Sequence, residues 1–508
     1  MNRVFGIETE FGITVDGVEH VDVVAESIEL VRRYTDHGAL MKWTYRLEDP
    51  HRDARGFRAP ELLQDTDEAA YVEVDRNRPL SFEEIKSDLV LSNGARFYND
   101  HAHPEYSTPE CTTLQQLVAQ EKAGERILAE CVRRRNKRLI PDDKKVRVYK
   151  NNTDFIGHSY GCHDNYLMSR HVPWERVVSD MLPFLITRQI FAGAGKMGVE
   201  MEGAAGQPGI YQISQRADFF TVVTSIDTMN RRPLVNTRDE PHADSTRFRR
   251  FHVIIGDANM SEFACALKIG TTSLVLDLIE QGRAPALELA QPIEATKAIS
   301  RDSSYAWIVE LQDGRKISAV EIQRLYLTAA RRLHAQPEGE TKWILDEWEK
   351  VLNDLDRDVT LCRDRCDWVA KKYLLDTFMA EEGVALDHPW LQSLDLEYHN
   401  VDIEDGLHHA LVRDGQMRRF LDEETIRNAI FLPPETTRAF FRGRAVARFQ
   451  PEIVSIHWDE VVFQYRGERH PISLNQAFND AELSRLNGLM SQAHSLGELL
   501  KALEKRDA

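Results

Sequence analysis

The sequence predicts a mixed α and β fold with more than one hydrophobic core. Short strand patterns recur through the first half of the chain, and residues 317–381 are mostly helical. A Leu432-Pro433-Pro434 segment then precedes a tail with its own strand and helix signals. The 508 residues exceed what one ordinary core holds, since a domain takes about 100–200 residues. We therefore expect a large domain over 1–432 and a small C-terminal domain over 433–508.

The first eighty residues combine regular segments with a long irregular one. Residues 3–15 alternate apolar and polar side chains, which predicts a strand, and residues 21–34 have helical spacing. Residues 40–80 carry many charges and show little periodicity, so we expect a mobile loop insertion there. Loops of this length inside compact enzymes are usually functional or mobile.

The remaining elements follow from the same patterns. The predicted strands are a pair at 94–110 and segments at 146–151, 165–169 and 251–255, and 206–218 and 234–238 are predicted as strand or loop segments. The predicted helices are 115–135, 174–191 and 261–281. In the tail we expect strands at 445–449 and 453–465 and a final helix from Asp480.

Charge and cysteine content exclude several classes of protein. The chain has 64 Lys and Arg against 82 Asp and Glu, a formal net charge of −18, which disfavours a general nucleic-acid-binding surface. Six cysteines are too few for a disulfide framework. No apolar run approaches the ~18 residues that span a bilayer, and the N-terminus lacks a secretory signal pattern. We expect a cytoplasmic protein that binds neither nucleic acid nor membrane, although a local basic groove remains compatible with this composition.

Glu8 and Glu10 are separated by one residue in the first predicted strand. Side chains at i and i+2 of a strand point to the same face, so the two carboxylates project together. A cation between them would relieve their repulsion, and hard oxygen ligands suit Mg²⁺. Taken alone, a solvated strand face is the simpler explanation of this pair.

A second polar cluster lies on the predicted strand pair. Arg96, Tyr98 and Asp100 alternate, so one strand face would present a guanidinium, a phenol and a carboxylate, and Glu105 follows a His103-Pro104 turn. Asp100 has two possible roles, general base or carboxylate nucleophile. The alternative for the whole cluster is a polar hairpin.

Histidine and arginine positions further along suit phosphate or metal. His163 follows a glycine-containing turn at 157–162, and imidazole can bind either ligand, although a lone histidine is usually structural. Arg216 and Arg238 belong to an arginine-rich set that can bind phosphate or carboxylate in a bidentate way; salt bridging is the alternative. Gly193 to Met197 is not a P-loop, because no Ser or Thr follows the lysine. The residues together indicate a Mg²⁺- and phosphate-dependent enzyme that has no P-loop.

Several of these segments resemble the motifs of the Pup ligase and Pup deamidase family. They are Gly6-Ile7-Glu8-Thr9-Glu10-Phe11-Gly12, Asn93 to Arg96, His103 to Tyr106, Gly161 to His163, Asn236 to Asp244 and Ile456-His457-Trp458. The matches run in order from residue 3 to about residue 460. The resemblance implies an α+β, glutamine synthetase-like fold: a curved antiparallel sheet with packed helices that cradles ATP (or ADP plus phosphate) and Mg²⁺, plus a small C-terminal domain.

The resemblance also implies roles for individual residues. The implied metal ligands are Glu8, Tyr98 and Glu105 for one site and Glu10, His163 and His252 for a second metal or phosphate set. The implied ATP-contacting residues are Arg96, Thr108 and Trp458, and the implied γ-phosphate or substrate-carboxylate arginines are Arg216 and Arg238. Asp100 matches the family's catalytic aspartate.

Two features resemble the deamidase branch of the family. They are the insert that contains Lys42 to Tyr45 and Asp53 to Phe57, and the short Asp100 to Glu105 run. This implies hydrolysis of the C-terminal Gln of Pup to Glu and cleavage of Pup from lysines, with Pup and pupylated proteins as partners and a pathway link to the proteasome. A groove for acidic Pup should be locally basic, and 131–150 and 247–250 are the candidate segments. The alternatives are the ATP-consuming Pup–protein ligase, a glutamate–cysteine ligase-type enzyme, and a Pup-binding adaptor without chemistry.

Overall fold

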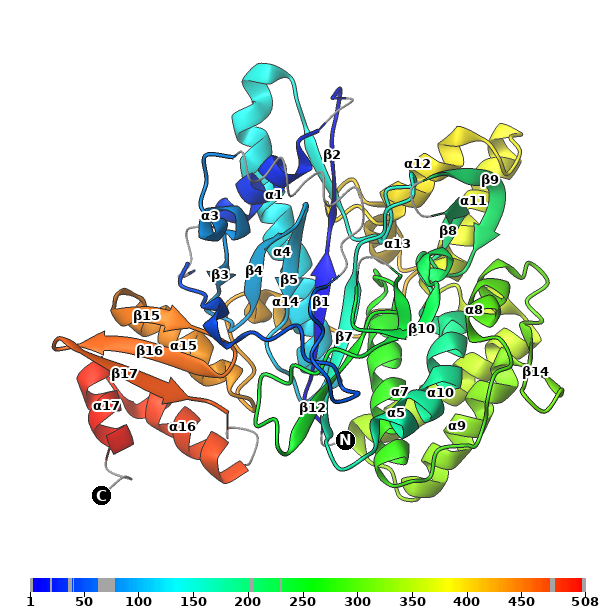
Figure 1. Cartoon of the computed structure of the whole chain (residues 1–508). Helices are drawn as coiled ribbons and strands as arrows, with labels where there is room; N and C mark the ends of the chain where they lie inside the picture. Colours follow the sequence, from blue (N-terminus) through cyan, green and yellow to red (C-terminus); the bar gives the residue numbers. More distant parts are fainter. Residues whose placement is uncertain are drawn as a thin grey trace.

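The computed structural model describes residues 3–18, 21–34, 39, 41–62, 78–201, 204–228, 231–475 and 480–504. At its centre is an antiparallel sheet in the order β12-β7-β1-β5-β4-β3 (Figure 1). Its strands are β1 (Phe5–Glu10), β3 (Leu89–Val90), β4 (Arg96–Asp100), β5 (His103–Ser107), β7 (Cys162–Ser169) and β12 (Phe248–Val253). An antiparallel sheet with separate helices is an α+β arrangement, which confirms the predicted fold class.

Strand β1 lies between β5 and β7, and its register determines what faces the site. Glu8 lies opposite Ser107 and His163, and Glu10 lies opposite Glu105. Alternate residues of β1 are buried, which leaves Glu8 and Glu10 on the less buried face, as the sequence pattern predicts. On the other face, Thr9 contacts helix α4 (Leu114–Leu139) by donating a 2.8 Å hydrogen bond to Glu121.

Helices cover the apolar face of the sheet and extend to one side of it (Figure 1). The main helices of this layer are α4, α5 (Trp174–Thr187), α7 (Glu262–Glu280), α9 (Ala319–Leu333) and α10 (Gly339–Arg357). The predicted helices at 115–135, 174–191 and 261–281 are confirmed within a few residues. The shorter helices are α1 (Val23–Arg32), α3 (Phe82–Lys86), α6 (Gln189–Ala192), α8 (Pro292–Arg301), α11 (Asp367–Glu382), α12 (Pro389–Tyr398), α13 (Leu407–Arg413) and α14 (Glu423–Ala429).

Short strand pairs surround the central sheet. They are β2 (Gly12–Val15) with β6 (Val146–Tyr149), β8 (Lys196–Met201) with β9 (Ala204–Gln212), β10 (Val222–Ser225) with β11 (Pro233–Asn236), and β13 (Ile308–Glu310) with β14 (Lys316–Ser318). The predicted first strand over 3–15 is thus two strands that join different sheets.

The C-terminal part has a hydrophobic cluster of its own, to which Val90 also belongs. Its elements are α15 (Ala439–Phe449), β15 (Ile453–Ile456), β16 (Glu460–Tyr465), β17 (Glu468–Ser473), α16 (Asp480–Gln492) and α17 (Leu496–Glu504). The predicted strand at 445–449 is wrong, because these residues end helix α15. Helix α15 is buried at consecutive positions over 439–443 and again at Ala445, Val446 and Phe449, so a window of five residues was too short to reveal the helix. The domain boundary at 432–433 stays a prediction.

Part of the predicted loop insertion is ordered against the rest of the protein. Trp43 pairs with Ile456, Asp53 pairs with Arg238, and Ala54 donates a backbone hydrogen bond to Thr237 at 2.8 Å. The centre of the insertion, 63–77, lies outside the described residues, so its mobility stays a prediction.

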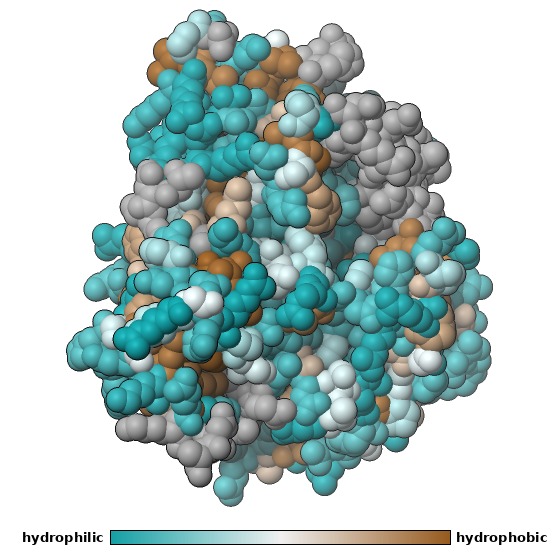
Figure 2. Space-filling model, turned by 60° about the vertical axis from the view of Figure 1, so that its left-hand side comes forward, coloured by the Kyte–Doolittle hydropathy of each residue, from teal (hydrophilic) through white to brown (hydrophobic). Residues whose placement is uncertain are grey.

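Within the described part of the chain, no helix is long and apolar enough to cross a membrane. The face in Figure 2 is mostly hydrophilic, and its hydrophobic residues form small separate groups.

Candidate active site

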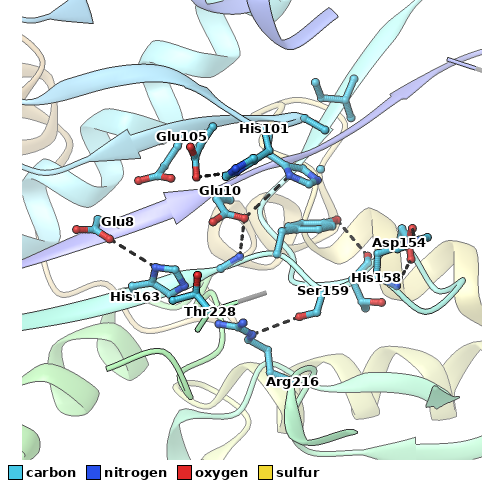
Figure 3. Close-up of a pocket in the computed structure, with 18 of the residues that line it drawn as sticks. Glu8, Glu10, His101, Glu105, Asp154, His158, Ser159, His163, Arg216 and Thr228 are labelled. Carbon is cyan, nitrogen blue, oxygen red and sulfur yellow. Dashed lines mark hydrogen bonds and ion pairs between the residues drawn. The ribbon is translucent and has the colours of Figure 1, made fainter. Parts of the chain in front are cut away.

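A cavity of about 350 Å³ opens on the face of the sheet that carries Glu8 and Glu10; we call it the central cavity (Figure 3). Nine of the twelve sequence-predicted site residues line it. They are Glu8, Glu10, Tyr98, Asp100, Glu105, His163, Arg216, Arg238 and His252. Residues from six separate stretches of sequence thus line one cavity.

Glu8, His163 and His252 form the first possible metal-binding group. One ligand atom from each lies within 4.8 Å of the others, with His163 Nδ1 3.5 Å and His252 Nε2 3.7 Å from the Glu8 carboxylate. Burial opposes ionisation of Glu8, but His163, His252 and Arg250 outweigh it and lower the pKa of Glu8 well below its usual range. Burial also lowers the pKa of His252 to about 3, and neither of its ring nitrogens lies within hydrogen-bond distance of a partner among the described residues. A buried neutral imidazole next to a carboxylate suits a divalent metal.

Glu10, Asp100 and Glu105 form a second group whose oxygens lie within 4.8 Å of one another. Glu105 accepts hydrogen bonds from Tyr98 Oη at 2.7 Å and Ser107 Oγ at 3.2 Å, which are both neutral donors. Burial, together with the nearby carboxylates, raises the pKa of Glu105 well above its usual range. Three such carboxylates repel each other unless a cation lies between them, and an all-oxygen group suits Mg²⁺.

Asp100 has two basic neighbours. Lys86 Nζ lies 2.6 Å from its Oδ1, and His101 Nδ1 lies 3.2 Å from its Oδ2. Burial would raise the pKa of Asp100, but His101 and Lys86 outweigh it and hold the pKa well below its usual range. Sequence reasoning missed Lys86. Lys86 is the last residue of helix α3, which comes just before strand β3, and Asp100 is the last residue of β4, so the contact depends on how the helix packs beside the β3–β4 pair and no local sequence pattern indicates it.

Three arginines reach the central cavity. Arg216 is fully buried and donates to Ser159 Oγ at 3.3 Å and to the backbone oxygen of Ile254. Arg238 is surrounded by Arg250, Glu240, Glu8 and Asp100, and burial lowers its pKa. Arg232 also lines the cavity, and the sequence analysis did not single it out.

Thr108 and Trp458 line a smaller neighbouring cavity of about 90 Å³, which we call the aromatic recess. Glu8 lines both cavities, so the recess meets the central cavity at β1. Trp458 contacts Trp43 with 5.2 Å between ring centroids, and Thr108 Oγ1 accepts a 3.0 Å hydrogen bond from the backbone of Ile7. A flat aromatic wall beside a polar cavity suits a nucleotide base.

Arg96 lies outside both of these cavities. Its guanidinium lies over the rings of Trp43, at 4.2 Å, and Tyr98, at 3.9 Å, and it forms a 2.6 Å ion pair with Asp88. Arg96 thus connects the insertion to strand β4, and its contact with ATP stays a prediction.

The two predicted basic segments are not uniformly exposed. Lys150 is buried, with Nζ 2.7 Å from Glu121 and 2.8 Å from Glu125. In the second segment Arg249 is also buried, and Arg250 pairs with Glu8 at 3.1 Å. These residues therefore do not belong to an exposed basic groove, because nearby carboxylates or burial already account for them.

Comparison with known proteins gives a consistent result. The model of the family described as Pup-ligase protein matches residues 3–462. The chain is 43% identical to a depupylase of Acidothermus cellulolyticus and 40% identical to a Pup deamidase/depupylase of Mycobacterium tuberculosis, in each case over 92% of this chain and 92% of the relative. A Pup–protein ligase of Kineococcus radiotolerans is 42% identical, over 72% of this chain and 81% of the ligase.

Solved structures show the same fold. A complex of the prokaryotic ubiquitin-like protein Pup with its ligase PafA has a TM-score of 0.76 and 32% identity, and the match covers 99% of this chain and 95% of that one. PafA in complex with ADP has a TM-score of 0.72 and 35% identity, and covers 86% of this chain and 97% of that one. The predicted glutamine synthetase-like architecture is confirmed.

Proposed function

The chain belongs to the Pup-ligase family, and we propose that it is the family's hydrolase, which converts the C-terminal Gln of Pup to Glu and cleaves Pup from lysine side chains. One observation supports the hydrolase over the ligase. The depupylase relatives match over 92% of both chains, whereas a ligase relative of nearly equal identity, 42%, matches over only 72% of this chain. The part of this chain that the match with the ligase leaves out is therefore sequence that it shares with the depupylase relatives.

Asp100 is the residue best placed for the chemistry. It is ionised, it lies in the central cavity, and Lys86 and His101 fix its orientation. An ionised carboxylate can take a proton from water that attacks the amide carbonyl, or it can attack the carbonyl itself and form an anhydride that water then opens. Both routes consume one water and release ammonia or the lysine amine.

The two carboxylate and histidine groups fit Mg²⁺, and the aromatic recess fits a nucleotide. One ion would be held by Glu8, His163 and His252, and another by Glu10 and Glu105 with Tyr98 nearby. The nucleoside would be contacted by Thr108 and Trp458. Bound Mg²⁺ and nucleotide would supply positive charge and fixed geometry around the developing oxyanion. Hydrolysis of an amide needs no ATP energy, so we propose that ATP, or ADP with phosphate, is a cofactor and is not consumed stoichiometrically.

The test is mass spectrometry of two reactions. Pup ending in Gln and a Pup–lysine conjugate are each incubated with the protein, Mg²⁺ and either ATP or a slowly hydrolysed analogue. Conversion of the terminal amide to a carboxylate, and release of the free lysine protein, should persist with the analogue. Conjugates formed from Pup ending in Glu, with ADP rising in step, would instead identify the ligase.

Asp100→Asn separates an enzyme from an adaptor. We expect turnover to fall by roughly 10²–10⁴-fold while Pup binding is kept, because the amide cannot accept a proton or act as a nucleophile. The control is Asp16→Asn, whose side chain is 46% exposed and pairs with Arg147 away from the cavity. Unchanged turnover in Asp100→Asn would reject the assignment. The cytoplasmic location, the proteasome link and the absence of a nucleic-acid partner stay predictions.

A further inference from the structure

A groove of about 550 Å³ opens from the central cavity; we call it the side groove. Asp154, Phe155 and Leu396 line both the side groove and the central cavity, so the two are continuous. No described residue lines both the side groove and the aromatic recess. A chain held in the central cavity can therefore continue into the side groove without entering the position proposed for the nucleotide.

Three segments form the walls of the side groove. They are the turn that carries Phe155 and Ile156, hairpin β8–β9 with Pro208, and the segment from Leu386 to Pro389 where helix α12 begins.

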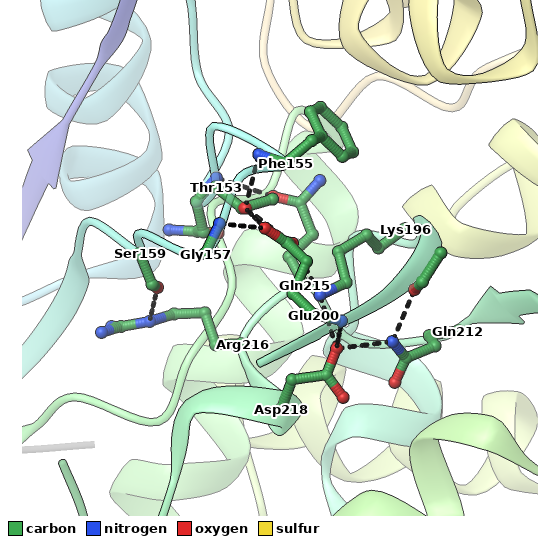
Figure 4. Close-up of polar contacts among 12 residues, drawn as sticks. Thr153, Phe155, Gly157, Ser159, Lys196, Glu200, Gln212, Gln215, Arg216 and Asp218 are labelled. Atoms are coloured by element: carbon green, nitrogen blue, oxygen red, sulfur yellow. Dashed lines mark hydrogen bonds and ion pairs between the residues drawn. The ribbon is translucent and has the colours of Figure 1, made fainter. Parts of the chain in front are cut away.

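A buried hydrogen-bond network fixes the turn (Figure 4). Glu200 accepts from Thr153 Oγ1 at 2.8 Å and from the backbone of Gly157 at 3.1 Å. Asp154 Oδ1 accepts from the backbone of Ile156 at 2.9 Å. This wall of the groove is thus preorganised, so little conformational entropy would be lost from it when a ligand binds.

The lining of the side groove combines apolar side chains with carboxylates. Ile156 is 59% exposed, and Trp390, which follows Pro389, is 56% exposed. Exposed large apolar side chains around a groove are typical of protein-binding surfaces. Asp387 is also exposed, and the described residues that line the groove include no lysine or arginine. The side groove is therefore apolar with a negative rim.

The proposed function requires two chains to leave the central cavity. In an isopeptide substrate, one chain is Pup and the other carries the lysine, whose aliphatic stem leads away from the amide. The C-terminal residue of Pup keeps a free α-carboxylate, which the carboxylates of the side groove would repel. The lysine stem is apolar, and its amine becomes a cation once it is released. An apolar groove with a negative rim therefore suits the lysine-bearing chain better than Pup.

We propose that the side groove binds the lysine-bearing segment of a pupylated protein. This rests on the proposed function and adds to it a surface for the protein that is released. The negative rim favours segments with basic residues next to the modified lysine. Deamidation of Pup ending in Gln releases only ammonia, so that reaction leaves the side groove empty and serves as an internal control.

The first test compares the two reactions in one variant. Ile156→Ser should lower kcat/KM for cleavage of a Pup–lysine peptide conjugate by roughly 10-fold, because an apolar contact is lost. Deamidation of Pup ending in Gln should stay unchanged. The matched control is Ile140→Ser, which should alter neither reaction, since Ile140 is 72% exposed at the end of helix α4 and lines neither the central cavity nor the side groove. Circular dichroism checks that each variant is folded.

The second test uses the charge of the rim. Two conjugates are compared, whose peptides carry either arginine or glutamate on both sides of the modified lysine. The unchanged protein should cleave the arginine-flanked conjugate with a kcat/KM higher by roughly 3–10-fold, and Asp387→Arg should reverse this preference. Asp313→Arg is the matched control and should keep the preference, because Asp313 is 53% exposed in the turn between β13 and β14.

Two results of these tests would overturn the proposal. Equal losses of conjugate cleavage and deamidation in Ile156→Ser would place Pup in the side groove. Unchanged rates of both reactions would show that the groove binds neither chain.

A binding measurement separates the side groove from the proposed function. Calorimetry on Asp100→Asn gives the affinity for the conjugate and for Pup ending in Glu without turnover. The conjugate should bind more tightly, and adding Ile156→Ser should remove the difference; equal affinities before that change would contradict the proposal. If the unchanged protein hydrolyses neither substrate but the difference is found, the proposed function fails and the assignment of the side groove stands.

Discussion

Buried carboxylates from neighbouring elements lie against both faces of strand β1, and their electrostatic surroundings are opposite. On the cavity face, Glu105 lies next to Glu10 and Asp100 and accepts hydrogen bonds only from the neutral hydroxyls of Tyr98 and Ser107 among the described residues. On the helix face, Glu121 and Glu125 of α4 are equally buried, but each has a lysine within 3 Å.

The difference shows in the direction of the pKa shifts. Burial and its acidic neighbours raise the pKa of Glu105. Burial also opposes ionisation of Glu125, but Lys122 and Lys150 outweigh it and lower its pKa. The helix face thus contains its own cations, and the cavity face is arranged to receive a cation from solution. The same residue type therefore supports the fold on one face and binds ligand on the other.

The largest effect is expected for Lys150→Met on the helix face. This change leaves Glu121 and Glu125 buried with one lysine fewer, so the free energy of unfolding should fall by about 3–5 kcal/mol. Urea unfolding followed by circular dichroism measures it. Lys145→Met is the control, because the Lys145–Asp405 pair is 45% exposed on both sides, and the cost should be about 0–1 kcal/mol. Equal losses in the two variants would contradict the comparison.

Glu110→Gln should have the next largest effect, and it has a pH signature. Glu110 lines the aromatic recess and forms 2.6 Å ion pairs with Arg438 and Arg442 of the C-terminal part. Burial opposes its ionisation, but the two arginines outweigh burial and lower its pKa from 4.5 to about 2. A depressed folded-state pKa stabilises the protein at high pH, here by about 3 kcal/mol above pH ~4.5.

That stabilisation should disappear as the pH falls from about 4.5 to about 2, where the carboxyl is protonated in both states. The measurement is the difference in unfolding free energy between the unchanged protein and Glu110→Gln at several pH values, so that other titrating groups cancel. A difference that stays constant between pH 7 and pH 3 would rule out the ion pairs as its source.

Most of the site residues on the cavity face could be predicted from the sequence, but the buried ion pairs on the helix face could not. Alternation along β1 and β4 is a local property, so the shared face of Glu8 and Glu10 and that of Tyr98 and Asp100 could be read directly. His163, Arg216 and Arg238 were singled out from their residue types, the family resemblance then added His252 and a role for each, and the structure brings the four together.

Residues whose role depends on long-range packing were missed. Lys150 was grouped with a basic surface segment, because only the packing of β6 against α4 shows that it is buried between two carboxylates. Lys86 reaches Asp100 from the end of helix α3, and Arg232 contacts a turn 73 residues away, and no local pattern contains that information. The end of the helix at 439–449 was misread for a related reason, since the mostly apolar five-residue segment 445–449, taken alone, does not distinguish helix from strand.

The smallest effect, and the one of opposite sign, is expected for Glu105→Gln on the cavity face. Without a divalent cation, this change removes one of three mutually repelling carboxylates and keeps the hydrogen-bonding shape, so the free energy of unfolding should rise by about 1 kcal/mol. Excess Mg²⁺ should stabilise the unchanged protein more than the variant, since the variant keeps the Glu8–His163–His252 group but loses one carboxylate of the second group, and ligand binding to the folded state adds stability only where a site exists.

Thermal unfolding in EDTA and in excess Mg²⁺ measures both effects. The matched control is Glu200→Gln, a buried carboxylate that accepts from Lys196 at 3.0 Å and should lose stability in both conditions. If Glu105→Gln behaved as Glu200→Gln does in EDTA, the cavity carboxylates would be structural like those of the helix face. The contrast between the two faces of β1 would then not indicate a cation site.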